Sequence, residues 1–248
     1  MRFRPSAPLS LSLLPLVCLI CWLGFWQLDR MHEKQELMDL FENAPEMTLQ
    51  EAIVANRQFA RVRVSGHYEA AWHLLLDNKT LQGRVGVHVL TLLVTEAGPS
   101  ILVNRGWLPL PPDRRSLPEI ATPTYQVTIT GILKLPAEGG IRLGEPEQLD
   151  RLDGPKLITY LDVNSLVPLL KNDLSPWLIL LDASDSSGFS GREWQPAVIL
   201  PAQHGAYAVQ WFALALAIVI VWLTLGRQRW DRLSQANSSA SQKRGKIQ

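Results

Sequence analysis

The chain has 248 residues, of which 47% are hydrophobic and only 19% are charged, and its formal net charge is +1. Soluble domains carry about 25% charged residues, and disordered chains are far less apolar, so the composition excludes a disordered protein and points to a membrane. The charge is unevenly divided, with +2 over residues 1–28, −6 over residues 29–205 and +5 over residues 206–248. The acidic middle segment excludes the basic surface that nucleic-acid binding requires.

The first apolar stretch, residues 5–28, contains no charged residue. About 20 helical residues cross the hydrocarbon core of a bilayer, so the sequence predicts a transmembrane helix over residues 8–28 after a cytoplasmic N-terminus of residues 1–7. A cleavable signal peptide is the competing interpretation. It is disfavoured because no small-x-small cleavage site follows the apolar run, which ends in bulky aromatic residues such as Trp26.

A second uncharged stretch predicts a transmembrane helix over residues 206–226, followed by a basic cytoplasmic tail of residues 227–248. Because basic flanks stay in the cytoplasm, residues 29–205 are expected on the outer side of the membrane. This predicts a multi-pass protein of the bacterial inner membrane with both termini cytoplasmic and a periplasmic central domain. An organellar equivalent has the same topology. The polar tail from Ser234 is expected to be disordered.

The middle segment has the alternation of apolar and polar residues that is typical of half-buried strands. Strands are predicted over residues 61–68, 72–77, 85–94, 100–107, 125–133, 156–163 and 176–182. Short helices are predicted over residues 30–43, before Pro45, and over residues 165–170. The expected fold class is a membrane α+β protein, in which two transmembrane helices in helical-hairpin topology frame a mostly antiparallel β barrel or sandwich.

Few side chains suggest chemistry of their own. The sequence has no glycine-rich phosphate loop, nucleophile elbow or H-E-x-x-H motif, so we expect a protein without enzymatic activity. Cys18 and Cys21 have the spacing of a redox dithiol, but an apolar run keeps thiols neutral, which favours membrane packing. The spacing of His67, His73 and His88 does not define a tetrahedral metal site.

Two polar segments, residues 77–79 and residues 104–107, have the Asn, Asp and Gly content of turns. Turn chemistry is therefore the first interpretation of both. The second interpretation applies to residues 104–107, where an exposed pair of Arg105 and Trp107 could dock a partner or a propionate.

His204 stands at the outer mouth of the second predicted span. If the helix begins there, Tyr207, Ala208 and Trp211 share its face, at positions i+3, i+4 and i+7. The positive end of the helix dipole favours a neutral imidazole, which is the form that ligates a metal. Small Ala208 beside the flat rings would leave room for a planar macrocycle. Alternatively, His204 is an interfacial polar residue and the aromatic residues belong to a membrane belt.

Several motifs occur in a characteristic order. Residues 24–34 carry G-x-W-Q-x-x-R-x-x-x-K, and residues 66–68 carry G-x-Y. The motifs that follow are G-x-x-V-x-T at residues 86–91, V-N-R-G-W at residues 103–107, W-Q-P at residues 194–196 and H-x-x-Y-A-x-Q-W-F at residues 204–212. With these motifs the chain resembles the Surfeit locus protein 1 family of cytochrome c oxidase assembly factors.

The resemblance implies a role in building haem-copper oxidase, in which the protein binds haem a and assists its insertion into the catalytic subunit. The proposed axial ligand of the family falls on His204, where haem iron is the only metal expected, and the sequence does not identify a second axial ligand. Tyr207 and Trp211 could stack on the ring, and Arg105 could pair with a propionate. The implied partners are cytochrome c oxidase subunit I, other oxidase assembly factors, a haem a synthesis enzyme and membrane lipid. The alternative is a cofactor-free membrane scaffold that stabilises an oxidase subunit assembly intermediate.

Overall fold

The structure is a computed structural model that describes residues 5–111, 116–136, 154–170, 173–196 and 199–244. The chain divides into two compact units, and each is described by itself. The first unit, Met1–Asp39 with Pro196–Gln248, contains two long helices and is called the helix pair. The second unit, Leu40–Gln195, is called the sheet domain.

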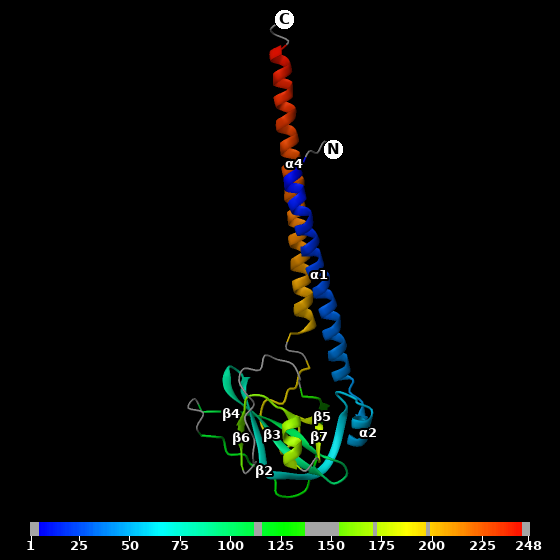
Figure 1. The fold of residues 1–248 in the computed structure, drawn as a ribbon, viewed down its shortest axis with the longest axis vertical. Coiled ribbons are helices and arrows are strands. Elements are labelled where there is room, and N and C mark those ends of the chain that lie inside the picture. Colours follow the sequence, from blue (N-terminus) through cyan, green and yellow to red (C-terminus); the bar gives the residue numbers. More distant parts are fainter. Residues whose placement is uncertain (1–4, 112–115, 137–153, 171–172, 197–198, 245–248) are drawn as a thin grey trace. The chain divides into compact units, whose positions relative to one another are not determined.

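The helix pair consists of α1 (Ala7–Glu42) and α4 (Pro201–Arg244), which lie side by side (Figure 1). The most apolar 18-residue windows of the two helices have mean hydropathies of 2.1 and 2.3, and only 11% of each window is buried. Helices this apolar and this exposed are suited to lipid rather than to the core of a soluble protein. The chain is therefore a two-span membrane protein with an extramembrane β domain. As predicted, α1 continues through its polar residues and ends before Pro45.

Small residues bring the two helices together. A Cβ atom added at Gly24 of α1 would lie 2.7 Å from the Phe212 ring of α4, so the ring fills the space that a side chain would need. The same ring meets Phe25 edge-to-face, with 5.2 Å between centroids. Ala208 and Ala215 of α4 are also buried. Contacts between small residues are the usual means of close helix packing in lipid, where the hydrophobic effect does not drive association.

The end of α4 differs from the expectation. Disorder was predicted from Ser234, but α4 continues to Arg244, so that prediction is wrong up to this residue. The added segment contains neither proline nor glycine, and a helix that is already nucleated extends through such residues at little cost. Residues 245–248, like Arg2 and Arg4 at the other end, lie outside the described residues.

In the described part of the sheet domain, seven strands form the sheet. They are β1 (Glu46–Met47), β2 (Arg61–Leu81), β3 (Arg84–Thr95), β4 (Ser100–Pro109), β5 (Val127–Lys134), β6 (Lys156–Ile158) and β7 (Leu174–Leu181). Pairing runs from β2 through β3, β4, β7 and β5 and returns to β2, which closes a ring of five strands. Within the ring only the β4–β7 pair is parallel. Of the two predicted β architectures the structure adopts the barrel, which leaves no open edge in the ring.

Inward side chains of the ring form the larger of two apolar clusters found among the described residues, the other being Leu75, Val87, Val89 and Leu110. The larger cluster is the core of the ring and includes Val62, Val64, Tyr68, Leu93, Ile101, Val103, Ile129, Leu133, Trp177, Ile179 and Leu181. A short helix that the sequence analysis missed, α2 (Leu49–Val54), adds Leu49 and Ala52 to this core. Thr48 and Glu51 close its first turn as a capping box. A helical turn, α3 (Val163–Leu166), continues as a 3₁₀ turn (Val167–Leu170), in the place where a short helix was predicted.

Strand β2 contains both strands that were predicted over residues 61–68 and 72–77. It continues through the residues between them because β-bulges accommodate the extra residues. The register with β3 shifts between Tyr68 and His73 and again between Leu76 and Lys79. The turn predicted at residues 77–79 is the second of these bulges. The actual turn consists of Gln82 and Gly83, whose φ angles of 50° and 76° are those of a two-residue type I′ hairpin.

Candidate functional site

The start of α4 places His204 in the first helical turn. Pro201 occupies the first helical position, where its missing N–H leaves no hydrogen bond unmade. The Gln203 side chain caps the start of the helix, because its Oε1 atom accepts a 3.2 Å hydrogen bond from the Leu200 backbone N–H. His204 is only 8% exposed in this position.

His204 contacts the other helix through one ring nitrogen. Its Nδ1 atom lies 2.7 Å from Oε1 of Gln27 on α1. An amide oxygen only accepts hydrogen bonds, so Nδ1 must carry the proton and donate. In a neutral imidazole this leaves the lone pair on Nε2, the nitrogen that is free to act as an acceptor or a metal ligand.

The second nitrogen of His204 is the unusual one. Nε2 is buried and has no hydrogen-bond partner among the residues that the structure describes. Leaving a buried polar atom unsatisfied costs about 1–3 kcal/mol, so native proteins rarely do so without a functional reason. The arrangement in which Nδ1–H is held by an oxygen while Nε2 is free is also the one found in metal-ligating histidines. His204 therefore has the chemistry of an axial ligand, provided the side chains that cover its Nε2 atom move aside.

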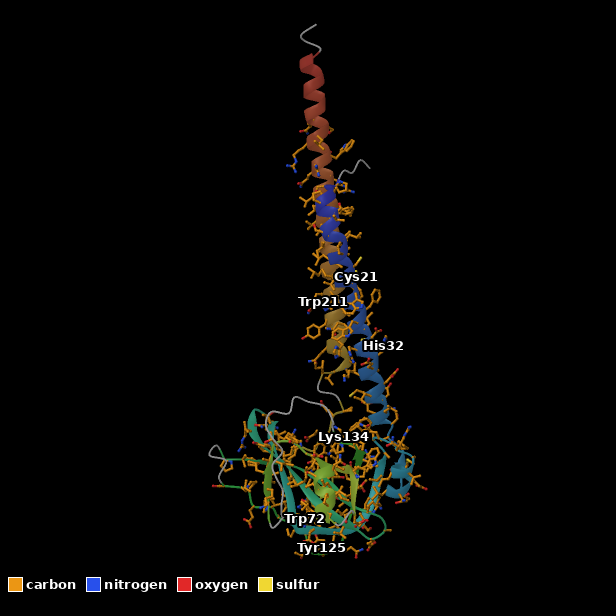
Figure 2. The ribbon with its side chains drawn as sticks, viewed as in Figure 1. Cys21, His32, Trp72, Tyr125, Lys134 and Trp211 are labelled. Carbon is orange, nitrogen blue, oxygen red and sulfur yellow. The ribbon has the colours of Figure 1, made fainter. Side chains whose placement is uncertain are left out.

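A groove lies beside this histidine on the helix pair. Its volume is about 450 Å³, and it is lined by Gln27, Tyr207, Gln210, Trp211 and Leu214. The four α4 residues follow the i, i+3, i+4, i+7 spacing of one helix face, and Figure 2 shows Trp211 on α4. Gln27 links the groove to His204, because its side chain both lines the groove and accepts the histidine hydrogen bond.

The structure thus brings Tyr207 and Trp211 to one groove, as the helical spacing predicts, but it changes the role of Ala208. Ala208 is 1% exposed and is not among the residues that line the groove. Its small side chain permits close helix packing and does not create room for a macrocycle. The open space lies on the Tyr207–Trp211 face instead.

Arg105 belongs to the sheet domain and is almost completely buried, at 1% exposure. Its guanidinium donates to the Ser187 carbonyl at 2.8 Å, to the Ala121 carbonyl at 2.7 Å and to Thr122 Oγ1 at 3.3 Å. The Tyr68 ring lies 4.7 Å from its Cζ atom. Burial lowers the pKa of Arg105. The expected exposure of Arg105 is wrong; its pairing with a propionate stays a prediction, against which these contacts argue.

The segment that contains Arg105 is part of a strand and not a turn. Residues 104–107 lie within β4, where Gly106 adopts a φ of 111° at a break in the register with β3. Trp107 is 4% exposed, and its indole N–H donates to the Lys79 carbonyl at 3.0 Å. Its backbone N–H donates to the Ser190 carbonyl at 2.7 Å. The V-N-R-G-W motif therefore fastens β4 to the chain segments that cross it.

Two histidines of the sheet domain, His73 and His88, are hydrogen-bonded. His73 Nδ1 lies 3.0 Å from Thr91 Oγ1, and its Nε2 lies 3.2 Å from Thr122 Oγ1. Burial, with a smaller effect of Arg105, lowers the pKa of His73 to about 4. Burial also lowers the pKa of His88 to about 4, with a smaller effect of Lys79. Among the described residues no group of three or more His, Cys, Asp or Glu could hold a metal ion, and both cysteines are free.

Gln27 is the site residue to which the sequence analysis gave no role. It was seen as part of the G-x-W-Q motif, but only the folded helix pair shows that its amide oxygen faces His204. A signal was present in the sequence, since Gln27 is an amide at the end of a long uncharged run. A polar side chain there needs a hydrogen-bond partner, and interhelical hydrogen bonds are a common solution.

Comparisons with known proteins agree with these motifs. The model of the SURF1 (Surfeit locus protein 1) family matches residues 13–216. A SURF1-like protein of Monosiga brevicollis is 24% identical over 233 residues, which cover 85% of this chain and 84% of that protein. A SURF1-like protein of Rickettsia prowazekii is 23% identical over 209 residues, covering 81% and 82% respectively. The family match covers most of α1, the sheet domain and the first part of α4, and on this basis the chain belongs to the SURF1 family.

Proposed function

We propose that the protein is an assembly factor for haem-copper cytochrome c oxidase, which binds haem a through His204 and assists its insertion into the catalytic subunit. Membership of the SURF1 family, generally known for oxidase assembly, supports the general role. The observation that carries the haem part is the buried Nε2 atom of His204, which has no partner while Nδ1 is held by Gln27. The protein acts as a carrier and performs no catalysis of its own.

The arrangement suits haem a as cargo. Haem a, when bound, supplies an iron that takes an axial nitrogen ligand, together with a long isoprenoid tail. A helix pair in lipid leaves the tail in the hydrocarbon while the histidine holds the iron at the polar edge. Tyr207 and Trp211 line the groove beside Gln27 and offer flat surfaces for the ring. Arg105 is left out of this site because its guanidinium is buried in hydrogen bonds within the sheet domain.

The location follows from the charge pattern. Basic residues flank both spans on the side of the chain termini, so both termini are proposed to lie in the cytoplasm of a bacterium. The sheet domain is then periplasmic and attached to the inner membrane. The proposed partners are oxidase subunit I, other oxidase assembly factors and a haem a synthesis enzyme, all of which meet the cargo in or at this membrane.

A scaffold without a cofactor is the second candidate, and one observation favours it. Nε2 of His204 is buried, so iron reaches it only after neighbouring side chains move. In a scaffold, the His204–Gln27 hydrogen bond would simply fasten α1 to α4 while the sheet domain holds an oxidase subunit. The scaffold accounts for the bond to Nδ1 but gives no reason for the unsatisfied Nε2, which is why the carrier is preferred.

The test is an optical spectrum of the full-length protein, purified from cells that synthesise haem a, beside three variants. We expect a haem a spectrum in the wild type and its loss in His204→Ala. Gln27→Leu removes the acceptor that orients the ring, and such changes weaken metal binding by about 10–100-fold. Gln27→Glu keeps an acceptor and should retain most of the haem.

His32→Ala is the matched control, because His32 is an exposed histidine of α1 (Figure 2). Its spectrum should equal that of the wild type. Equal haem content in His204→Ala and wild type would show that a residue other than His204 binds the iron. A folded wild-type protein without haem would favour the scaffold.

A further inference from the structure

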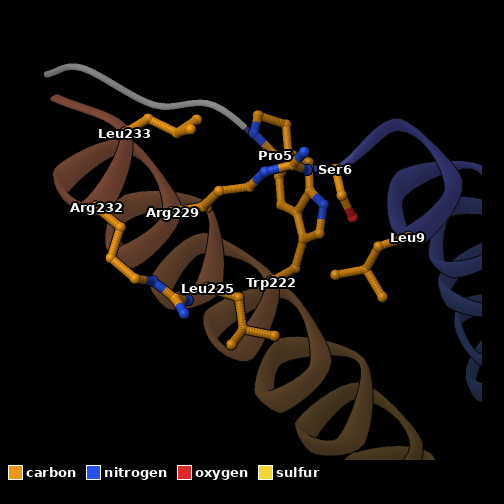
Figure 3. Close-up of a pocket in the computed structure, with 9 residues that line it drawn as sticks. Pro5, Ser6, Leu9, Trp222, Leu225, Arg229, Arg232 and Leu233 are labelled. Carbon is orange, nitrogen blue, oxygen red and sulfur yellow. The ribbon is translucent and has the colours of Figure 1, made fainter. Parts of the chain in front are cut away.

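A second groove lies between the helices, remote from His204. It has a volume of about 450 Å³ and lies between the start of α1 and the later part of α4 (Figure 3). Its lining residues are Pro5, Ser6, Leu9, Trp222, Leu225, Gly226, Arg229, Arg232 and Leu233. His204 and Arg229 are separated by about 37 Å along α4 at 1.5 Å per residue, so the two grooves are distinct.

The lining of this groove has two chemically different parts. Leu9, Trp222 and Leu225 form apolar walls within or beside the predicted spans. Arg229 and Arg232 follow directly after the uncharged stretch that ends at residue 226. Figure 3 shows Arg229 extended towards Pro5 and Ser6, and Arg232 beside Leu225. The apolar part thus faces the hydrocarbon, and the cationic part lies where lipid headgroups begin.

The two guanidinium groups carry uncompensated charge. Both side chains are exposed, and neither forms an ion pair among the residues that the structure describes. Arg232 Nε donates to the Gln228 carbonyl at 3.4 Å, which leaves its other N–H groups available. Residues 206–248 contain six basic residues and one acidic residue, Asp231. The site therefore has donors for an anion and little nearby negative charge.

The apolar wall is held in place from the other helix. The Trp222 indole N–H donates a 3.0 Å hydrogen bond to Ser10 Oγ of α1. This bond satisfies the polar edge of the indole and fixes the position of Trp222 in the groove lining. The groove is therefore built by both helices together and would be absent from either helix alone.

We propose that this groove binds an anionic phospholipid of the phosphatidylglycerol type. Arg229 and Arg232 hold the phosphate, and an acyl chain runs along Leu9, Trp222 and Leu225. Guanidinium forks match phosphate oxygens in a bidentate way, and basic pockets between transmembrane helices are typical sites for anionic headgroups. A zwitterionic lipid would bring its own cation to the arginines. A free phosphate ion would leave the apolar walls uncovered.

A lipid at this site would tie the end of α4 to the start of α1. It would act at the membrane face away from the proposed haem site, and it does not depend on haem binding. The inference therefore stands or falls separately from the proposed function.

Native mass spectrometry of the full-length protein tests it, with dioleoyl phosphatidylglycerol or dioleoyl phosphatidylcholine added to the detergent-solubilised sample. We expect preferential retention of the anionic lipid. Arg229→Gln with Arg232→Gln should weaken its binding by roughly fivefold for each arginine. Lys243→Gln with Arg244→Gln removes the same charge from the same tail outside the groove and should have little effect. Equal weakening in the two double variants, or no preference for the anionic lipid, would overturn the proposal.

A second measurement needs no arginine variant. In nanodiscs of phosphatidylcholine, brominated phosphatidylglycerol should quench the emission that Trp222 contributes, taken as wild type minus Trp222→Phe. Brominated phosphatidylcholine at the same fraction should quench it less. Equal quenching by both lipids contradicts the site, and so does displacement of the anionic lipid by millimolar inorganic phosphate, which would show an anion site without lipid selectivity.

Discussion

Two buried histidines, one in each unit of the molecule, differ in how completely they are hydrogen-bonded. His73 in the sheet domain is 3% exposed, and both ring nitrogens lie near threonine hydroxyl groups. His204 in the helix pair is 8% exposed, and in the described part of the chain only its Nδ1 atom has a partner. Native proteins satisfy nearly all buried polar atoms. The fully bonded His73 therefore holds the fold, whereas Nε2 of His204 is the atom to which we propose that a ligand binds.

The basic side chains show the same contrast. Arg105 in the sheet domain donates to two carbonyls and a threonine hydroxyl and lies between two aromatic rings. Arg229 and Arg232 in the helix pair are exposed and line an apolar groove. The polar groups of the sheet domain thus serve the fold, while those of the helix pair are the ones that we propose to bind haem and lipid. Three experiments would break or sharpen this contrast.

The largest effect is expected for Arg105→Met. The change leaves the carbonyls of Ser187 and Ala121 without their donor and removes the cation from the Tyr68 and Phe189 rings. We expect a loss of about 3–5 kcal/mol in the free energy of unfolding of the sheet domain. Denaturant unfolding of the full-length protein, followed by tryptophan fluorescence, measures it.

Arg63→Met is the control, since Arg63 is an exposed residue of β2, and its effect should stay within about 0.5 kcal/mol. A stable Arg105→Met protein with weakened haem binding would reverse the interpretation. Arg105 would then serve the cargo, as the propionate hypothesis holds, and the contrast between the two regions would fail.

The next effect is a pH dependence of stability in the sheet domain. Burial lowers the pKa of His73 from 6.5 to about 4, so between these values the unfolded chain binds a proton that the folded chain does not. Stability must therefore fall as the pH falls from 6.5 to 4, by about 2–3 kcal/mol from this residue. Denaturant unfolding at several pH values between 7 and 4 measures the slope.

His73→Asn should remove the share of His73 from this slope even if it lowers stability at every pH, and it should leave the share of His88, whose pKa burial also lowers to about 4. His67→Asn should leave the slope as it is, since His67 is exposed on the same strand. An unchanged slope in His73→Asn would mean that the imidazole is not held neutral by burial, and the contrast with His204 would lose its physical basis.

The fold was predictable where the pattern is local. The two spans follow from uninterrupted hydropathy, and most strands follow from alternation within a few residues. The joining of two predicted strands in β2 was not predictable, because its bulges are set by pairing with β3. Residues 104–107 were misread for a related reason. Arg105 is buried by residues 121–122 and 187–189, whose approach cannot be read from the motif itself.

The candidate site also has one part that could be predicted from local sequence and one part that could not. Helical spacing alone predicts Tyr207 and Trp211 on one helix face, and both residues line the same groove. The pairing of His204 with Gln27 joins residues 177 positions apart, and no periodicity within either helix specifies it. What fixes the pairing is the relative rotation of the two helices, which depends on contacts such as Phe212 over Gly24.

The smallest effect concerns this pairing of the helices. Ser10→Ala removes the acceptor of the Trp222 indole N–H, and interhelical hydrogen bonds in membranes contribute about 0.6 kcal/mol on average. A double-mutant cycle with Trp222→Phe, measured by denaturation of the full-length protein in mixed micelles, should give a coupling of about that size.

Ser12→Ala is the control, since Ser12 is exposed and bonds only to carbonyls of its own helix. A coupling near zero would mean that the bond does not join the helices. The fixed indole wall, on which the lipid groove depends, would then be lost, while the site at His204 and Gln27 would be unaffected.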